Sequence, residues 1–152
     1  MSEELRVSDV MSRDLVVAYP EETVVDAARK MAENNVGSVI VVDRYEKSRV
    51  VGILTESDIV KRVVAKGLNP SETLVEDVMT RNPIIVEEDT PLRVAADLMR
   101  ERGIGHLPVV DKAGRLRGVV TRTDIVRIAP GLIEYLYVVA GSERGGSGEE
   151  GE

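Results

Sequence analysis

The sequence predicts an α/β fold in which one β-α-β-β-α unit is written twice. Residues recur at a fixed spacing, so that Val10-Met11 matches Val78-Met79, 68 positions further on. Short apolar runs rich in β-branched residues alternate with stretches of helical period. A segment of glycine, two apolar residues, threonine, any residue, a hydroxyl and an aspartate occupies residues 52–58 and again 118–124.

The first strand and first helix of each copy are visible in the pattern. The apolar runs 15–18 and 83–86 predict the strands. Glu21-Glu22-Thr23 opens the first helix, which we expect to reach about Asn34, with acidic residues suited to the helix dipole. In the second copy, Asp89-Thr90-Pro91 predicts a cap and a first-turn proline. The apolar stripes of the two helices are Val24, Ala27, Ala28 and Met31, and Leu92, Ala95, Ala96 and Met99.

Two further strands and a second helix complete each copy. The runs 38–42 and 50–54, like 107–110 and 116–120, are nearly all apolar, which predicts strands covered on both faces. A helix follows each repeated segment. Gly67 predicts the end of the first such helix, and Pro130 predicts that the second ends near Ile128.

These elements predict the organisation of the chain. We expect the first copy at 7–67, a linker at 68–74 and the second copy at 75–129. An apolar segment, 130–140, is expected to pack on the domain as a short helix, and the glycine- and glutamate-rich tail, 141–152, is expected to be disordered.

Composition excludes several classes of function. The chain has 152 residues, a net charge of −7, one histidine and no cysteine. The negative charge argues against nucleic-acid or anionic-membrane binding, and no apolar run is long enough to span a membrane. Without cysteine or a histidine cluster there is no zinc ligand set, and phosphate-loop and nucleophile motifs are absent. We therefore expect a cytoplasmic protein that is not an enzyme and holds no metal.

The duplicated unit and its ending G-h-h-T-x-S/T-D-I-V (h, apolar) resemble the cystathionine β-synthase (CBS) domain family. Two tandem copies look like a Bateman module, and the resemblance covers about residues 7–129. It implies two sheets packed face to face about a pseudo-twofold axis, with two clefts between the copies. It also implies an adenosine-bearing ligand such as AMP, ADP, ATP, S-adenosylmethionine or an NAD-type molecule, and association into flat dimers.

The repeated segment permits two interpretations of Asp58 and Asp124. Each aspartate could cap the following helix, which is the simpler interpretation of one copy alone. Each could instead accept hydrogen bonds from a ribose diol, while the neighbouring hydroxyls bind phosphate at the helix start. Three polar side chains exceed what a cap requires, and with the resemblance this favours a ligand role. Capping by Ser57 or Thr123 could coexist with it.

The resemblance implies that each cleft joins one copy's motif to the other copy's wall. The first cleft would contain Thr55, Ser57, Asp58, Thr80, Ile84, Ile104, Gly105 and His106. The second would contain Thr121, Thr123, Asp124, Ser12, Val16, Val36, Gly37 and Ser38. Core packing for the apolar members and a special turn for the glycines are the alternatives.

The two expected clefts differ in their capacity for phosphate. His106 stands where some family members carry a phosphate-contacting arginine, whereas Ser38 occupies that position in the other copy. A histidine hydrogen-bonded at the boundary of the copies is the alternative. Further candidate phosphate partners are Arg13, Arg81 and Arg122, and a solvated surface arginine is the alternative for each of them. We therefore expect the Asp58 cleft to be the better nucleotide site.

Two functions remain open at this stage. The chain could be a regulatory module that senses adenine nucleotides and passes a conformational change to a protein partner or through a homodimer. Alternatively, its clefts could be vestigial and the chain a dimerising or docking subunit. The apolar residues 132–139 would then form the contact surface.

Overall fold

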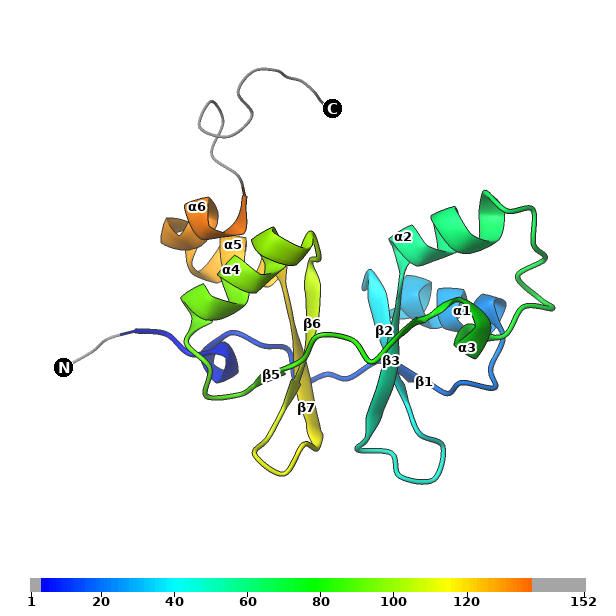
Figure 1. Cartoon of the computed structure of the whole chain (residues 1–152), viewed down its shortest axis with the longest axis horizontal. Helices are drawn as coiled ribbons and strands as arrows, with labels where there is room; N and C mark the ends of the chain where they lie inside the picture. The colour runs from blue at the N-terminus through cyan, green and yellow to red at the C-terminus, as the bar shows by residue number, and fades with distance from the viewer. Residues whose placement is uncertain (1–3, 138–152) are drawn as a thin grey trace, which may run out of the picture.

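The computed structural model describes residues 4–137, which form two lobes with their sheets facing each other and their helices outside (Figure 1). The tail predicted to be disordered, 141–152, lies outside the described residues, as do 138–140. The two-layered lobes confirm the predicted duplicated α/β fold.

The first lobe contains a four-stranded sheet in the order β1-β2-β3-β4. Its strands are β1 (Val17–Ala18), β2 (Ser38–Val42), β3 (Val50–Thr55) and β4 (Thr80–Arg81). Strand β1 runs parallel to β2, and the other neighbours are antiparallel. All five residues of β2 are buried, as expected for a strand covered on both faces.

The second lobe repeats this plan with the order β5-β6-β7. Its strands are β5 (Val86–Glu87), β6 (His106–Val110) and β7 (Leu116–Thr121). Strand β5 is parallel to β6, and β6 is antiparallel to β7. The short lengths of β1 and β5 correct the predicted strands 15–18 and 83–86, since only the last part of each run pairs with its neighbour.

Helices cover the outer faces of both sheets. The first lobe has α1 (Val24–Asn34) and α2 (Glu56–Ile59), and α2 continues into the π-helical turn η2 (Val60–Val64). The second lobe has α4 (Leu92–Arg102) and α5 (Arg122–Ile128), followed by the 3₁₀ turn η3 (Pro130–Leu132) and α6 (Ile133–Leu136). The predicted stops are confirmed, since Gly67 has a positive φ of 71° and α5 ends before Pro130.

The helix starts differ in part from the prediction. Thr23 caps α1 by accepting a hydrogen bond from the Asp26 amide at 3.2 Å. In α4 the predicted cap from Asp89 or Thr90 is wrong, because Pro91 itself occupies the N-cap position and provides no side-chain acceptor. The amides of the first turn use backbone carbonyls instead, since the Leu92 amide donates to the Leu5 carbonyl at 2.8 Å and the Val94 amide to the Pro91 carbonyl at 3.0 Å.

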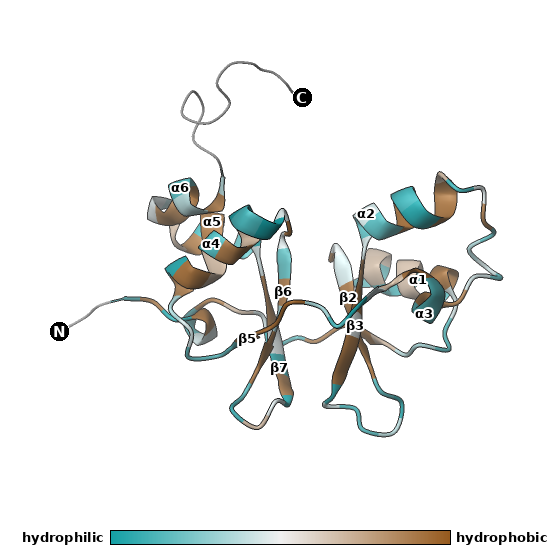
Figure 2. Cartoon of the chain, in the orientation of Figure 1, coloured by the Kyte–Doolittle hydropathy of each residue, from teal (hydrophilic) through white to brown (hydrophobic). Residues whose placement is uncertain are grey.

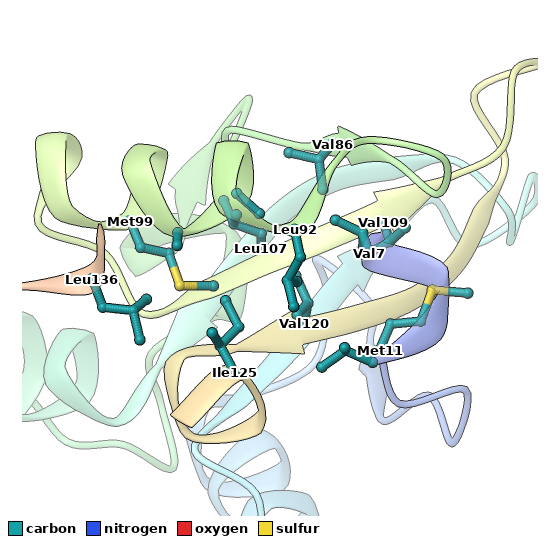
Figure 3. Packing of buried hydrophobic residues seen from close by; sticks show 13 residues of the cluster. Val7, Met11, Val86, Leu92, Met99, Leu107, Val109, Val120, Ile125 and Leu136 are labelled. Carbon is teal, nitrogen blue, oxygen red and sulfur yellow. The ribbon is translucent and has the colours of Figure 1, made fainter. Parts of the chain in front are cut away.

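Each repeat's opening segment crosses to the other lobe. Val7 of the 3₁₀ turn η1 (Val7–Asp9) packs with Met11 in the core of the second lobe, against Leu92 and Val120 (Figure 3). In return, Val78 of α3 (Val75–Val78) packs in the core of the first lobe.

The crossing segments complete the sheet edges. Thr80 of β4 pairs with Ile53 of β3, and Ser12 forms an antiparallel bridge with Val119 of β7. Because the two contacts are reciprocal, each sheet is completed by the opening segment of the other repeat.

The two motif glycines make this exchange possible. A Cβ at Gly118 would lie 2.6 Å from the Ser12 carbonyl oxygen and 2.8 Å from the Met11 sulfur. A Cβ at Gly52 would lie 2.5 Å from the Met79 sulfur and 3.0 Å from the Thr80 carbonyl oxygen. The glycine that begins each repeated segment is therefore required by the close approach of the crossing chain.

A third apolar cluster lies where the sheets meet. It joins Ile40 and Ile53 of the first lobe to Leu116 of the second, with Val119 packed beside them. The Leu116 amide also donates to the Ser48 carbonyl across the lobes at 2.8 Å. In Figure 2 the facing strands carry much of the brown, hydrophobic colour, while the outer helices show both hydrophobic and hydrophilic residues. This contact confirms the predicted face-to-face packing.

Candidate functional site

Two cavities open where the motif strands end, each between the lobes. One, of about 460 Å³, lies at the end of β3 and contains Asp58. The other, of about 530 Å³, lies at the end of β7 and contains Asp124. We name them the Asp58 cavity and the Asp124 cavity.

The structure brings together the sixteen residues that the sequence assigned to two clefts. The Asp58 cavity is lined by Thr55, Ser57, Asp58, Thr80, Ile84, Ile104, Gly105 and His106. The Asp124 cavity is lined by Thr121, Thr123, Asp124, Ser12, Val16, Val36, Gly37 and Ser38. The exchanged segments cause this mixing, because they carry Thr80 and Ser12 onto the sheet of the other repeat.

Several residues line a cavity to which they were not assigned, although Arg122 was a candidate phosphate partner and Gly37 and His106 were each assigned to the other cleft. In the Asp58 cavity they are Gly37, Ile53, Glu56, Asn82, Gly103 and Arg122. In the Asp124 cavity they are Asp14, Asn35, Ile40, Glu56, His106, Val119 and Arg127. Two of them had a signal in the sequence, since Glu56 and Arg122 occupy the variable position of the repeated segment, next to the predicted hydroxyls.

Helix capping by the motif takes the same form in both repeats. The Thr55 hydroxyl accepts from the Asp58 amide at 3.1 Å, and the Asp58 carboxylate accepts from the Thr55 amide at 3.0 Å. The corresponding distances for Thr121 and Asp124 are both 3.1 Å. The predicted capping by Ser57 or Thr123 is wrong, because the preceding threonine is the last strand residue and already occupies the N-cap position.

Capping uses only one oxygen of each aspartate. The other oxygen of Asp58 lies 3.7 Å from Nε of Arg62, and that of Asp124 lies 3.1 Å from a guanidinium nitrogen of Arg127. Both arginines are about half exposed or more. A carboxylate offers about four lone-pair sites, so each aspartate can cap its helix and still accept hydrogen bonds from a molecule in the cavity.

A thin wall separates the two cavities. Gly37, Glu56 and His106 line both of them. A Cβ on Gly37 would lie 3.1 Å from a carboxylate oxygen of Glu56 and 3.3 Å from Cε1 of His106. Gly37 and Gly105 do not have positive φ values. The space taken by neighbouring side chains, rather than a special turn, therefore accounts for glycine at these positions.

Arg122 is the only one of the three candidate arginines that lines either cavity. Its guanidinium donates to the Ile104 carbonyl at 2.9 Å and lies 5.4 Å from the centre of the Tyr137 ring. A Cβ on Gly105 would be 3.1 Å from this guanidinium. The buried Nε has no hydrogen-bond partner among the described residues. Arg122 is thus held flat against the cavity wall with unused donor capacity.

His106 lies at the boundary of the cavities and is surrounded by charge. Burial lowers its pKa from the usual 6.5, and the nearby Arg122 lowers it further. Glu56, Asp124 and Asp58 oppose that shift. The imidazole is therefore mainly neutral at pH 7. Its Nδ1 is buried without a hydrogen-bond partner in the part of the chain that the structure describes.

Residues 4–137 contain neither a metal-ligand cluster nor a membrane-spanning helix. Within this range no three His, Cys, Asp or Glu side chains are grouped so that they could hold a metal ion. None of the helices described there has the length and apolarity needed to cross a membrane.

Comparison with known proteins identifies the domain type. The family model described as the CBS domain matches twice, at residues 7–65 and 75–131. An uncharacterized protein of Methanopyrus kandleri is 43% identical over 127 residues, which are 84% of this chain and 64% of the relative. The chain thus spans less than two thirds of that relative's length.

Solved structures show the same arrangement. A CBS domain protein from Pyrobaculum aerophilum, complexed with AMP, has a TM-score of 0.79 and 31% identity, covering 86% of this chain and 98% of that one. A hexameric CBS-CP12 protein from bloom-forming cyanobacteria has a TM-score of 0.77 and 28% identity, covering 85% and 74%.

Proposed function

The chain belongs to the CBS domain family, and on that premise we propose that it is a non-catalytic regulatory module that senses an adenosyl ligand. We assign AMP, ADP or ATP to the cavities, with related adenosyl compounds as further members of the class. The ligand would occupy the Asp58 cavity, the Asp124 cavity or both.

One observation carries the proposal. Each cavity combines two hydroxyls and a carboxylate at a helix start with apolar side chains from the other repeat. A helix start with hydroxyls favours a phosphate, a carboxylate suits a ribose diol, and an apolar wall suits a flat base. The AMP complex of the Pyrobaculum protein supports the same ligand class.

The cavities have the size that such a ligand needs. Their volumes of about 460 and 530 Å³ lie within the range of small-molecule sites. Apolar contacts would come from Ile84 and Ile104 in the Asp58 cavity and from Val16 and Val36 in the Asp124 cavity. These pairs are partly buried and pack at the edges of the two lobe cores.

Sensing would follow from the position of the cavities between the lobes. A ligand that contacts Asp58 from one repeat and Ile104 from the other favours the lobe arrangement in which both contacts are made. The shift is limited by the difference in the ligand's affinity for the two arrangements. A protein partner or a second copy of the chain would then respond to that arrangement.

Calorimetric titration with AMP, ADP, ATP, S-adenosylmethionine and NAD tests the ligand class. We expect at least one of them to bind with a Kd below about 1 mM, equivalent to about 4 kcal/mol. Asp58→Asn is expected to weaken binding in its cavity at least tenfold, because the amide keeps an oxygen for the cap but loses the charged acceptor. Asp124→Asn should do the same in the other cavity.

A matched control is available outside the cavities. Asp43 also accepts two backbone hydrogen bonds, from Tyr45 and Glu46, at 3.0 and 2.8 Å. Asp43→Asn should leave every affinity unchanged. If all five ligands fail to bind at millimolar concentration, the proposed function is wrong. If binding occurs but survives both cavity substitutions, the site assignment is wrong.

A second role, homodimer formation, is favoured by exposed apolar side chains on the outer helices. Val60 and Val64 of the α2–η2 helix are 58% and 64% exposed, and Ile128 and Ile133 are also exposed. Only Ile133 among these residues belongs to the predicted segment 132–139. Within that segment Leu136 is buried in the second lobe, and Val138 and Val139 lie outside the described residues. Sedimentation of the wild type and of Val64→Asp measures this role, and we expect the variant to be monomeric.

A further inference from the structure

Glu56 and Arg122 occupy equivalent places in the two repeats but carry opposite charges. Each begins the helix that follows the motif threonine. The Glu56 amide donates to the Gly37 carbonyl at 3.0 Å, and the Arg122 amide donates to the Gly105 carbonyl at 2.9 Å. Each charged side chain lies against its glycine, where a Cβ would be 3.1 Å away. The backbone frame is the same, and the charge is reversed.

These two charges are distributed unequally between the cavities. Arg122 lines the Asp58 cavity and is absent from the lining of the Asp124 cavity. Glu56 lies in the shared wall and lines both. The Asp58 cavity therefore has Arg122 to offset Glu56.

The Asp124 cavity has no unpaired arginine among its lining residues to balance the charge of Glu56. It holds Asp14 in addition to Glu56 and Asp124. The one arginine that lines it, Arg127, forms an ion pair with Asp124 at 3.1 Å and is 64% exposed. Three carboxylates thus face one arginine that is already paired.

We propose that the two cavities select adenosyl ligands by charge. The Asp58 cavity takes the phosphorylated ligand, and the Asp124 cavity takes an adenosyl ligand without phosphate. Arg122 and Glu56 are the residues that determine this specificity. The inference rests on the proposed function, since it divides between two cavities the ligand class assigned to both.

The chemistry of Arg122 supports the phosphate assignment. Its fork of five N–H donors suits phosphate oxygens. Within residues 4–137 its guanidinium makes one hydrogen bond, to the Ile104 carbonyl. The contact with Tyr137 and the bond to Ile104 hold the guanidinium in place before a ligand arrives. A charge-assisted pair formed by such a group is stronger than a bond between neutral groups.

In the Asp124 cavity a phosphate would instead meet like charge. Glu56 and Asp14 would each repel it, which raises the free energy of the bound state. Both residues are exposed, so added salt weakens this repulsion. An uncharged nucleoside meets no such penalty. It can still use Asp124 as a hydrogen-bond acceptor and Val16 and Val36 as apolar contacts.

AMP and adenosine form a matched pair of probes, because they differ only by the phosphate. We expect AMP to bind in the Asp58 cavity at least about tenfold more tightly than in the Asp124 cavity, a difference of one charge-assisted contact. Calorimetry on Asp58→Asn should show loss of AMP binding with adenosine binding retained. Asp124→Asn should retain AMP binding, and its adenosine affinity should fall.

Arg122→Gln tests the specificity residue directly. Glutamine can still donate to the Ile104 carbonyl but lacks the charge. We expect the ratio of AMP affinity to adenosine affinity to fall at least about tenfold. Arg13→Gln removes the same charge from a residue outside both cavities and should leave the ratio unchanged. Glu56→Gln should raise AMP affinity in the Asp124 cavity.

The possible failures can be distinguished. If neither AMP nor adenosine binds to wild-type protein, the inference is lost together with its proposed adenosyl sites. If AMP fills both cavities with equal affinity, or if Arg122→Gln leaves the affinity ratio unchanged, charge selection is wrong and the sensing function stands. Because a loss of folding weakens both ligands together, a change in the ratio does not arise from destabilisation alone.

Discussion

The Asp58 and Asp124 cavities share a backbone frame and differ in the side chains mounted on it. Both have a threonine cap, an aspartate that completes the cap, and a close glycine in the opposite wall. At equivalent positions the first repeat has Ser38 where the second has His106, and Glu56 where the second has Arg122. The difference teaches that the residues which preserve the fold are repeated, whereas those that only line the cavities have diverged.

Substitution of the motif glycines should change stability by different amounts in the two repeats. Gly118→Ala places a methyl group 2.6 Å from a backbone oxygen, which cannot move without shifting the crossing chain. We expect a loss of about 2–3 kcal/mol in the free energy of unfolding. Gly52→Ala meets the Met79 thioether most closely, which can rotate away, so about 1 kcal/mol is expected. Urea denaturation measures both.

Gly131→Ala is the control for these substitutions. No atom lies within 4 Å of a Cβ at Gly131, and we expect a change below about 0.5 kcal/mol. Equal losses for Gly52→Ala and Gly118→Ala would mean that the two crossings are equally rigid, which would contradict the difference drawn from their nearest atoms.

Substitution of the two N-cap threonines tests whether the repeats have the same helix-capping geometry. Thr55→Ala and Thr121→Ala each remove an acceptor for a helix amide, and each should cost about 1 kcal/mol of unfolding free energy. The exposed Ser57 and Thr123 make no cap bond, so Ser57→Ala and Thr123→Ala should change stability by less than about 0.5 kcal/mol. Thermal melting of the four variants measures this, and a larger effect from Ser57 than from Thr55 would overturn the assignment of the cap.

His106 is expected to give a smaller, pH-dependent difference between the repeats. Burial and Arg122 lower its pKa below 6.5 in the folded protein, so the unfolded chain binds more protons in that range. The unfolding free energy therefore falls as pH drops from above 6.5 towards the lowered folded pKa, and the loss is complete below it.

The substitution His106→Ser copies the residue of the other repeat and removes the only histidine in the chain. The variant should lose less stability than the wild type between pH 7.5 and about pH 5.5, as measured by urea denaturation at each pH. Identical pH profiles for the two proteins would show that His106 titrates normally in the folded state.

Much of the fold follows from the sequence because the repeat supplies its own alignment. Matching Met11 with Met79 and Gly37 with Gly105 placed equivalent residues in register, and the resemblance then assigned sixteen residues to two clefts. The structure brings each set of eight together. The polar members of each set could be placed because they follow directly after apolar strands in the sequence.

The unpredicted features depend on contacts between distant parts of the chain. The crossing of Val7 and Val75 to the opposite lobes cannot be read from local pattern, because an apolar turn packs equally well on either core. Thr55 rather than Ser57 is the cap because β3 ends at Thr55. That end is determined by the pairing of Thr55 with Ser38 of β2. The role of Arg122 depends on the glycine that leaves room for it.

The reciprocal crossing has a consequence for how such a molecule can arise. A single repeat cut from the chain would have an unpaired sheet edge at Gly52 or Gly118 and an opening segment with no sheet to complete. Two identical repeats could satisfy both needs by exchanging those segments, as in a domain-swapped pair. The present chain has the topology of that pair joined end to end by the segment between η2 and α3. In a single chain the two halves can carry different side chains, as Glu56 and Arg122 do, whereas two identical subunits cannot.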